Sequence, residues 1–227
     1  MSHYVVENYD SIQREVEEVS CGQTSLLAVS KTFPADLIEI LYRERGVRSF
    51  AESRLKELQE KSELLPKDII WHYIGKIQSN KLKKIARIAR VIHSVENVET
   101  IQTLAELAMR ENLDVSYFLE VNISGEASKS GVAPQELDKL LEIAVSCQNR
   151  VKCIGFMTMA PFEATADELE EYFGNLHRLL EYKRTEFKLN ELTQLSMGMS
   201  NDFVIAIKKG STLVRIGSAI FGNRNYL

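Results

Sequence analysis

The residues best suited to chemistry lie near the two ends of the chain. Close to the C-terminus, two strand-like segments each run into a turn of small residues. The first turn holds Met199, Ser200 and Asn201, and the second holds Gly217 and Ser218. Backbone N–H groups and hydroxyls at such turns bind phosphate, and in an eight-stranded α/β barrel the loops after strands 7 and 8 are the usual phosphate site. These turns indicate a small phosphorylated ligand, although Ser200 could instead cap the following helix.

Lys31 ends the first apolar strand-like segment. In a barrel this position opens onto the face that carries active sites. A partly desolvated lysine has a lowered pKa and can form a Schiff base with an aldehyde, but a lysine that caps the strand in water explains this segment equally well. The phosphate turns favour the Schiff base, because barrel closure places the last strand beside the first.

Arg215 lies between Val214 and Ile216 in the last strand-like segment. A guanidinium buried there needs a partner, which is either a buried carboxylate or a ligand. We favour the ligand, because Arg215 lies two residues before the Gly217-Ser218 turn. Beside a pyridine ring, an arginine donates to the ring nitrogen and keeps it unprotonated, so the ring becomes a weak electron sink.

Other polar residues follow further predicted strands. Asn80 could reach the pocket or cap its helix, and Asn122 lies close to a strand end. Lys129, in the loop after Asn122, could meet the ligand as a second amine, although a solvated lysine is favoured. His72 has no serine or cysteine partner at a recognisable spacing and is interpreted as a hydrogen-bonded core residue.

These residues need a scaffold, and the chain alternates short β-rich segments with longer helical patterns. Strands are expected over residues 25–30, 47–50, 69–74, 91–94, 117–123, 153–157, 192–195 and 212–216, and helices over 5–19, 34–45, 53–61, 79–89, 98–111, 134–146, 166–186 and 202–208. This α/β order predicts a single-domain (β/α)8 barrel of the TIM type over residues 1–227. A doubly wound sheet is the alternative, but it needs a glycine-rich turn after the first strand, and residues 30–34 are not glycine-rich.

Composition narrows the function classes. The chain has 227 residues, 44% of them hydrophobic and 26% charged, with a net charge of −4. These values are typical of a globular domain and argue against general binding to nucleic acid or to anionic membranes, so the basic cluster over 81–90 is interpreted as a solvated helix face. Three cysteines without CxxC spacing disfavour a disulfide framework or a metal site and fit a reducing cytoplasm. No apolar run approaches the ~20 residues of a membrane span, and the first residues do not form a signal peptide.

Five longer motifs carry a family resemblance. They are Ala28-Val-Ser-Lys31-Thr, Trp71-His-Tyr-Ile-Gly-Lys-Ile-Gln-Ser-Asn-Lys81, Val121-Asn-Ile-Ser with Ser128-Lys-Ser-Gly131, Leu195-Ser-Met-Gly-Met-Ser200 and Val214-Arg-Ile-Gly-Ser-Ala-Ile-Phe-Gly222. In order and spacing they resemble the YggS/PROSC family of pyridoxal 5′-phosphate (PLP) homeostasis proteins, over nearly the whole chain.

The resemblance implies an alanine-racemase-like barrel with PLP bound to Lys31 as a Schiff base. It implies Arg215 near the pyridine nitrogen and Ser200, Gly217 and Ser218 around the phosphate. The full set of residues expected at the cofactor is Lys31, Ser53, Asn80, Asn122, Met199, Ser200, Arg215, Gly217 and Ser218. The chain departs from the family at one place, where Phe50-Ala51-Glu52-Ser53 replaces the usual Phe-Gly-Glu-Asn, so Ser53 stands where an asparagine would face PLP.

A fold alone does not establish a reaction. Alanine racemases carry a further β-domain that supplies an opposing tyrosine base, and this chain is expected to lack one after Leu227. The primary hypothesis is a monomeric, cytoplasmic carrier without catalytic turnover, which binds and buffers PLP and passes it to PLP-dependent apo-enzymes. The alternatives are a PLP-dependent amino-acid racemase that uses Lys31 as a base, and a Schiff-base aldolase for sugar phosphates that holds no coenzyme.

Overall fold

The computed structural model describes residues 3–126, 129–147 and 149–222. In this part of the chain, parallel strands close into a barrel in sequence order, with β8 paired to β1. The strands are β1 Ser25–Val29, β2 Ser49–Glu52, β3 Ile70–Tyr73, β4 Val91–Val95, β5 Val115–Glu120, β6 Val151–Met157, β7 Gln194–Ser196 and β8 Leu213–Ile216. The predicted (β/α)8 barrel is confirmed, and every predicted strand overlaps an observed one.

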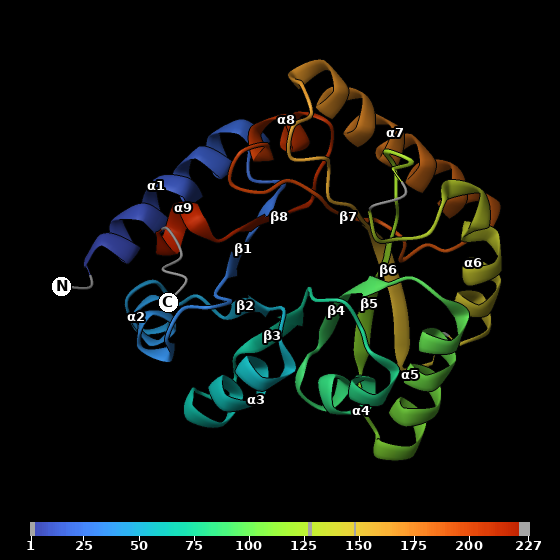
Figure 1. Cartoon of the computed structure of the whole chain (residues 1–227), viewed down its shortest axis with the longest axis horizontal. Coiled ribbons are helices and arrows are strands. Elements are labelled where there is room, and N and C mark those ends of the chain that lie inside the picture. The colour runs from blue at the N-terminus through green and yellow to red at the C-terminus, as the bar shows by residue number, and fades with distance from the viewer. Residues whose placement is uncertain (1–2, 127–128, 148, 223–227) are drawn as a thin grey trace.

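Helices surround the strands (Figure 1). They are α1 His3–Ser20, α2 Ala35–Arg45, α3 Leu55–Leu64, α4 Ser79–Ile88, α5 Val98–Glu111, α6 Leu137–Ser146 with the preceding 3-10 turn η1 Pro134–Glu136, α7 Ala166–Glu186, α8 Phe203–Lys208 and α9 Ser218–Phe221. The two helices whose predicted bounds match the structure, α5 and α7, both have side-chain N-caps. Asn97 accepts the Thr100 N–H, and Thr165 forms a capping box with Glu168.

Several bounds are shifted by a few residues, and two differences from the prediction have a local cause. The strand expected over 117–123 ends at Glu120, because Val121 forms only an isolated bridge with Val132 and Asn122 begins a turn. The short helix α9 was not expected, since four residues are too few to carry a helical periodicity.

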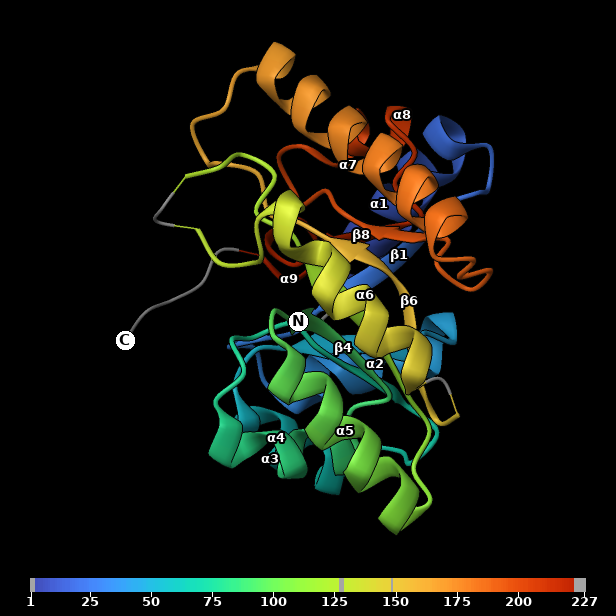
Figure 2. The same cartoon turned by 90° about the vertical axis from the view of Figure 1, so that its right-hand side faces the viewer.

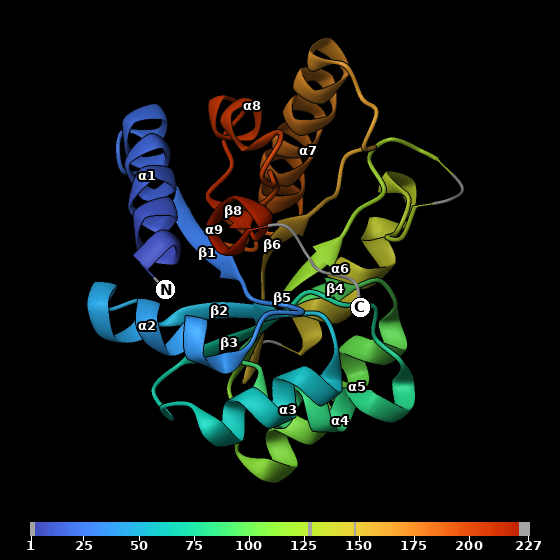
Figure 3. The same ribbon diagram turned by 60° about the vertical axis from the view of Figure 1, so that its left-hand side comes forward.

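The two ends of the chain close the barrel together. Leu27 of β1 is in register with Arg215 of β8. Outside the strands, the Tyr4 hydroxyl donates to the Phe221 carbonyl at 3.3 Å and Asn8 donates to the Ile220 carbonyl at 3.1 Å. Figures 1 and 3 show the result, with α1 in blue lying beside α9 in red. The end of the first strand therefore lies next to the end of the last.

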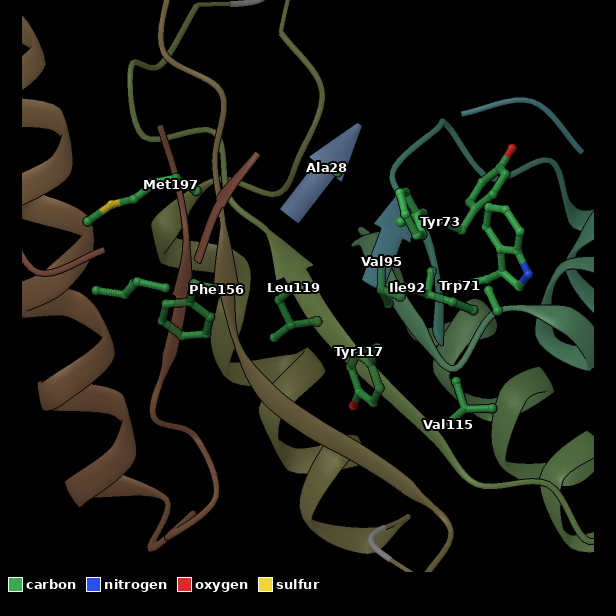
Figure 4. Packing of buried hydrophobic residues seen from close by; sticks show 14 of the residues in the cluster. Ala28, Trp71, Tyr73, Ile92, Val95, Val115, Tyr117, Leu119, Phe156 and Met197 are labelled. Carbon is green, nitrogen blue, oxygen red and sulfur yellow. The ribbon is translucent and has the colours of Figure 1, made fainter. Parts of the chain in front are cut away.

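Apolar side chains pack in two layers. The helices pack along the outside of the strands (Figure 2). The larger layer includes Trp71 and Tyr73 of β3, and Figure 4 shows part of it around Tyr117. A smaller cluster, separate from the larger layer, is formed by Leu27, Val29 and Ala51 with Ile74 and Leu213. Alternation along β3 thus separates Trp71 and Tyr73 from Ile74, as the sequence predicts. None of the described helices is both long and apolar enough to cross a membrane.

Candidate functional site

A pocket of about 130 Å³ opens at the carboxyl ends of the strands. It is lined by Val29, Lys31, Ile74, Met157, Met159, Met199, Ser200, Arg215, Gly217 and Ser218. Six of the nine residues predicted at the cofactor are among them, namely Lys31, Met199, Ser200, Arg215, Gly217 and Ser218. The structure therefore brings the two ends of the chain into one site at the face where barrel enzymes carry their chemistry.

Lys31 follows β1 by two residues and is half-buried. Leu27 and Val29 belong to the smaller apolar cluster. Lys31 continues their alternation, and it lines the pocket together with Val29. Its amine is thus presented to the same space as the turns after β7 and β8.

These two turns meet at Ser200 and Ser218. Their hydroxyl oxygens lie 3.1 Å apart, and the Ala219 N–H donates to Ser200 Oγ at 3.4 Å. Gly198 allows the first turn to come this close, because its φ of +95° favours glycine and a Cβ there would lie 2.7 Å from that of Ala206. The paired hydroxyls and the first turn of α9 form a polar wall of the pocket.

The structure corrects the predicted cap of α8. Asp202, and not Ser200, is the N-cap residue, because residues 200–202 form a turn before the helix begins at Phe203. The Asp202 carboxylate accepts the Met199 N–H at 2.5 Å, so this amide already has an anionic partner inside the protein. Burial raises the pKa of Asp202 above its ordinary value.

Arg215 is buried in the barrel wall and is held by three acceptors. Its Nη1 donates to the Ser196 carbonyl at 2.5 Å and to Ser196 Oγ at 2.8 Å, and its Nη2 donates to the Thr158 carbonyl at 2.9 Å. Within the described residues it forms no salt bridge, so its hydrogen-bond partners are neutral acceptors, while the nearby carboxyl groups of Asp202 and the buried Glu120 favour its charged form without contacting it in an ion pair. Burial lowers the pKa of Arg215 to about 10, and the side chain therefore stays cationic at neutral pH.

A hydrogen-bonded chain continues from Arg215 across the barrel. Ser196 Oγ lies 2.9 Å from His93 Nδ1, and His93 Nε2 lies 3.0 Å from His72 Nδ1. Arg215 can only donate, so Ser196 Oγ accepts from it, and the second lone pair and the proton of that hydroxyl are both available to His93 Nδ1. The direction of the Ser196–His93 and His93–His72 bonds therefore follows from which nitrogen of each ring carries the proton.

Burial keeps both imidazoles neutral. It lowers the pKa of His72 to about 4 and that of His93 well below its usual value. The interpretation of His72 as a hydrogen-bonded core residue is thus confirmed. Its partners His93 and Ser196 could not be found from spacing, because they come from different strands. The signal available was a polar residue inside an apolar strand.

Three predicted site residues do not line the pocket. Ser53 packs its carbonyl against Gly75, where an added Cβ would lie 2.0 Å from that oxygen. Asn80 is exposed in the first turn of α4, whose N-cap residue is Gln78. Asn122 turns back on its own loop, accepting the Gly125 N–H at 3.0 Å.

The loop after β5 also holds Lys129, which is half-buried and donates its backbone N–H to the Glu126 carbonyl at 3.1 Å. Ser128, which belongs to the motif singled out in the sequence, lies outside the described residues. Across the residues that are described, no group of three or more His, Cys, Asp or Glu side chains could hold a metal ion.

Comparison with known proteins agrees with this arrangement. The family model described as "Alanine racemase, N-terminal domain" matches residues 4–225. A pyridoxal phosphate homeostasis protein from Aquifex aeolicus is 36% identical over 220 residues, which cover 96% of this chain and 95% of that protein. The chain belongs to the pyridoxal phosphate homeostasis protein family. A family member from Pseudomonas aeruginosa is 41% identical over 204 residues, covering 88% of this chain and 85% of that one. The resemblance inferred from the motifs is confirmed.

Solved structures extend the comparison. PipY from Synechococcus elongatus, solved with PLP bound, has a TM-score of 0.86 and 30% identity, and the match covers 96% of this chain and all of PipY. An alanine racemase from Clostridium difficile has a TM-score of 0.73 at 16% identity, covering 97% of this chain and 57% of the racemase. The second likeness concerns the fold alone.

Proposed function

We propose that this protein binds PLP as a Schiff base on Lys31 and acts in PLP homeostasis as a carrier, without turning over amino acids. The observation that supports this most is that one pocket is lined by the lysine Lys31, by the two polar turns that carry Ser200 and Ser218, and by the buried arginine Arg215. PipY, similar along its whole length, has been solved with PLP bound. The relatives named above carry the homeostasis role in their names.

The residues present fit the cofactor. Ser200 and Ser218 offer hydroxyls that can rotate to donate to a phosphate, and Gly217 leaves room for it beside β1. Val29, Ile74 and Met157 give the pocket apolar walls suited to a flat ring. When bound, PLP supplies an aldehyde that condenses with a primary amine, and Lys31 is the lysine among the pocket-lining residues described.

Arg215 supports holding the cofactor more than activating it. Three acceptors fix its guanidinium, and its pKa of about 10 keeps it a donor at neutral pH. Facing a pyridine nitrogen, such a group donates without transferring its proton. The nitrogen then stays unprotonated and the ring withdraws electrons weakly.

The test is spectroscopic and chemical. The protein mixed with PLP should develop a visible absorption band, and borohydride should fix the pyridoxyl group on the peptide that contains Lys31. Lys31→Arg should abolish both signals. A label found on Lys129 alone would contradict the assignment, and a protein that traps a sugar phosphate on Lys31 but gains no colour with PLP would be an aldolase.

The same proposal extends to organisation and partners. We infer a single domain over residues 1–227, a monomer, and PLP-dependent apo-enzymes in the cytoplasm as recipients. Sedimentation of the protein with and without PLP checks the monomer. Transfer of PLP to an apo-enzyme across a membrane that passes only small molecules would show that hand-over needs no contact.

A further inference from the structure

Side chains hold the backbone on both sides of Lys31. Before it, the Ser30 carbonyl accepts from Lys61 Nζ at 2.9 Å, and the Ser30 hydroxyl donates to Glu52 Oε1 at 2.6 Å. After it, the Thr32 N–H donates to Glu57 Oε2 at 2.6 Å. These contacts come from the end of β2 and from α3, so they approach Lys31 from outside the barrel while its side chain lines the pocket.

The three holding residues also bind one another. Lys61 Nζ lies 2.7 Å from Glu52 Oε1 and 3.4 Å from Glu57 Oε2. The side chains of Lys61 and Glu52 are 8% and 0% exposed, so water screens their interaction little. We refer to Glu52, Glu57 and Lys61 as the Lys31 clamp.

Stability is a poor explanation for the clamp. Removing two charges from water costs free energy that their attraction often fails to recover. Glu52 Oε2 is, in addition, buried with no hydrogen-bond partner among the described residues. An apolar pair of similar volume would hold β2 against α3 at least as well, which points to a requirement for a specific geometry.

Thr32 shows what geometry is required. Its φ is +70°, in the left-handed region, where a β-branched side chain is strained. The other described non-glycine residues with positive φ are Cys21, Asn112 and Lys188, none of them β-branched. The bond from the Thr32 N–H to Glu57 holds this turn, and the turn sets the direction in which the Lys31 side chain leaves the backbone.

We propose that Glu52, Glu57 and Lys61 are positioning residues that fix the backbone on both sides of Lys31 and thereby aim its amine into the pocket. An amine held in this way meets an aldehyde without first searching for its orientation, and small misplacements slow such reactions strongly. The ligand part of this inference rests on the proposed function of Lys31. The backbone part stands without it.

The backbone part is tested on the protein without PLP. Amide hydrogen exchange at Thr32 should be roughly tenfold faster or more in Glu57→Ala, since one charge-assisted hydrogen bond is lost. Glu57→Gln retains an acceptor oxygen and should restore most of the protection. Replacing Glu52 by Gln together with Lys61 by Met removes both buried charges at once and should expose the Ser30–Thr32 segment in the same way.

Lys183→Met provides the matched control. Lys183 is also buried and also contacts two carboxylates, Asp138 and Glu186, but it lies on α7 and does not line the pocket. This variant should leave Thr32 exchange as in the parent protein. Thr32 protection that is unchanged in both clamp variants, or lost equally in Lys183→Met, would overturn the proposal.

The part of the inference that concerns the ligand is tested with PLP itself. The clamp variants should form the borohydride-trapped product on Lys31 roughly tenfold more slowly or worse, whereas competition by inorganic phosphate, which reports on Ser200 and Ser218, should not change. Trapping at the parent rate in folded clamp variants would refute this part. If the parent protein forms no product, the proposed function fails and Thr32 exchange still decides the positioning role. Should the double variant not fold, the comparison of Glu57→Ala with Glu57→Gln decides.

Discussion

The hydroxyl oxygens of Ser200 and Ser218 lie 3.1 Å apart, although 18 residues separate them in the chain. Each belongs to a turn at the carboxyl end of a strand, Ser200 after β7 and Ser218 after β8. Hydroxyls this close can both donate to one oxyanion. We infer that this relationship makes one anion site out of two turns that separately would only be loops.

We therefore expect Ser200→Ala to weaken the binding of PLP more than that of pyridoxal, which lacks the phosphate. Losing one hydrogen bond to a charged group costs about 1.5–3 kcal/mol, or roughly ten- to a hundredfold in affinity. Calorimetric titration with both ligands measures the difference. Equal losses for the two ligands would mean that Ser200 supports the fold and not the phosphate.

Replacing Asp202 should strengthen the binding of PLP, whereas replacing Ser200 should weaken it. The Asp202 carboxylate accepts the N–H of Met199, which lines the pocket together with Ser200. A phosphate bound at Ser200 would therefore lie near this negative charge. Asp202→Asn keeps an acceptor oxygen for Met199 and removes the charge. A charge a few ångströms from another costs roughly 1–4 kcal/mol near a protein surface, so PLP should bind about tenfold more tightly to the variant. Pyridoxal affinity serves as the control and should stay unchanged. Weaker PLP binding to Asp202→Asn would disprove this reading of Asp202.

The buried histidines predict how stability depends on pH. The pKa of His72 falls from 6.5 to about 4 on folding, so below 6.5 the unfolded state takes up a proton that the folded state refuses. The contribution of neutral His72 to the free energy of unfolding is therefore fully present only above pH 6.5. It is lost as the pH falls towards 4, and the loss between about pH 7 and pH 5 is about 2 kcal/mol. His93 acts with the same sign, since burial also lowers its pKa.

The variant His72→Asn isolates this contribution. Its side-chain amide can accept from His93 Nε2 or donate to it, and it does not titrate, so the variant should lose less stability than the parent between those pH values. Burial raises the pKa of Glu52 and of Glu120 to about 7, which acts with opposite sign in both proteins and cancels in the comparison. Urea unfolding at the two pH values gives the result. Parallel pH profiles for parent and variant would show that His72 does not carry the dependence.

The sequence predicted the fold because local signals agree along the chain. Helical patterns that alternate with β-rich segments marked the helices, and α5 and α7 begin and end at the predicted residues. Lys31, Arg215 and the turns at Ser200 and Gly217 could be placed together because barrel closure fixes which strand ends are neighbours. The predicted proximity of these residues depended only on the order in which the strands pair, and that strand order is confirmed.

Side-chain direction in loops could not be predicted in this way. Asn122 follows a strand, yet its amide satisfies the backbone of its own turn, and this competition is invisible in the sequence. Ser53 follows β2 with the alternation of Ala51, but its carbonyl is fixed by close packing against Gly75. The partners of Arg215 are Ser196 at the end of β7 and Thr158 just after β6, and their contact depends on three-dimensional register.

The last prediction is that the protein loaded with PLP does not catalyse amino-acid chemistry. Among the pocket-lining residues that the structure describes, Lys31 and Arg215 are the titratable ones, and Arg215 is held as a cation by Ser196 and Thr158. A base on the opposite side of a bound amino acid is thus absent from these lining residues. An arginine that donates to the pyridine nitrogen would leave that nitrogen unprotonated, so negative charge at the α-carbon would be poorly stabilised. Incubation with L-alanine in deuterated water, followed by mass spectrometry and chiral chromatography, measures the outcome. We expect α-proton exchange near the rate seen with free PLP, and the Lys31→Arg variant serves as the control for exchange that does not use the pocket. Racemisation or deuteration at about 1 s⁻¹ or faster, as in typical enzymes, would replace the carrier by a racemase-like enzyme.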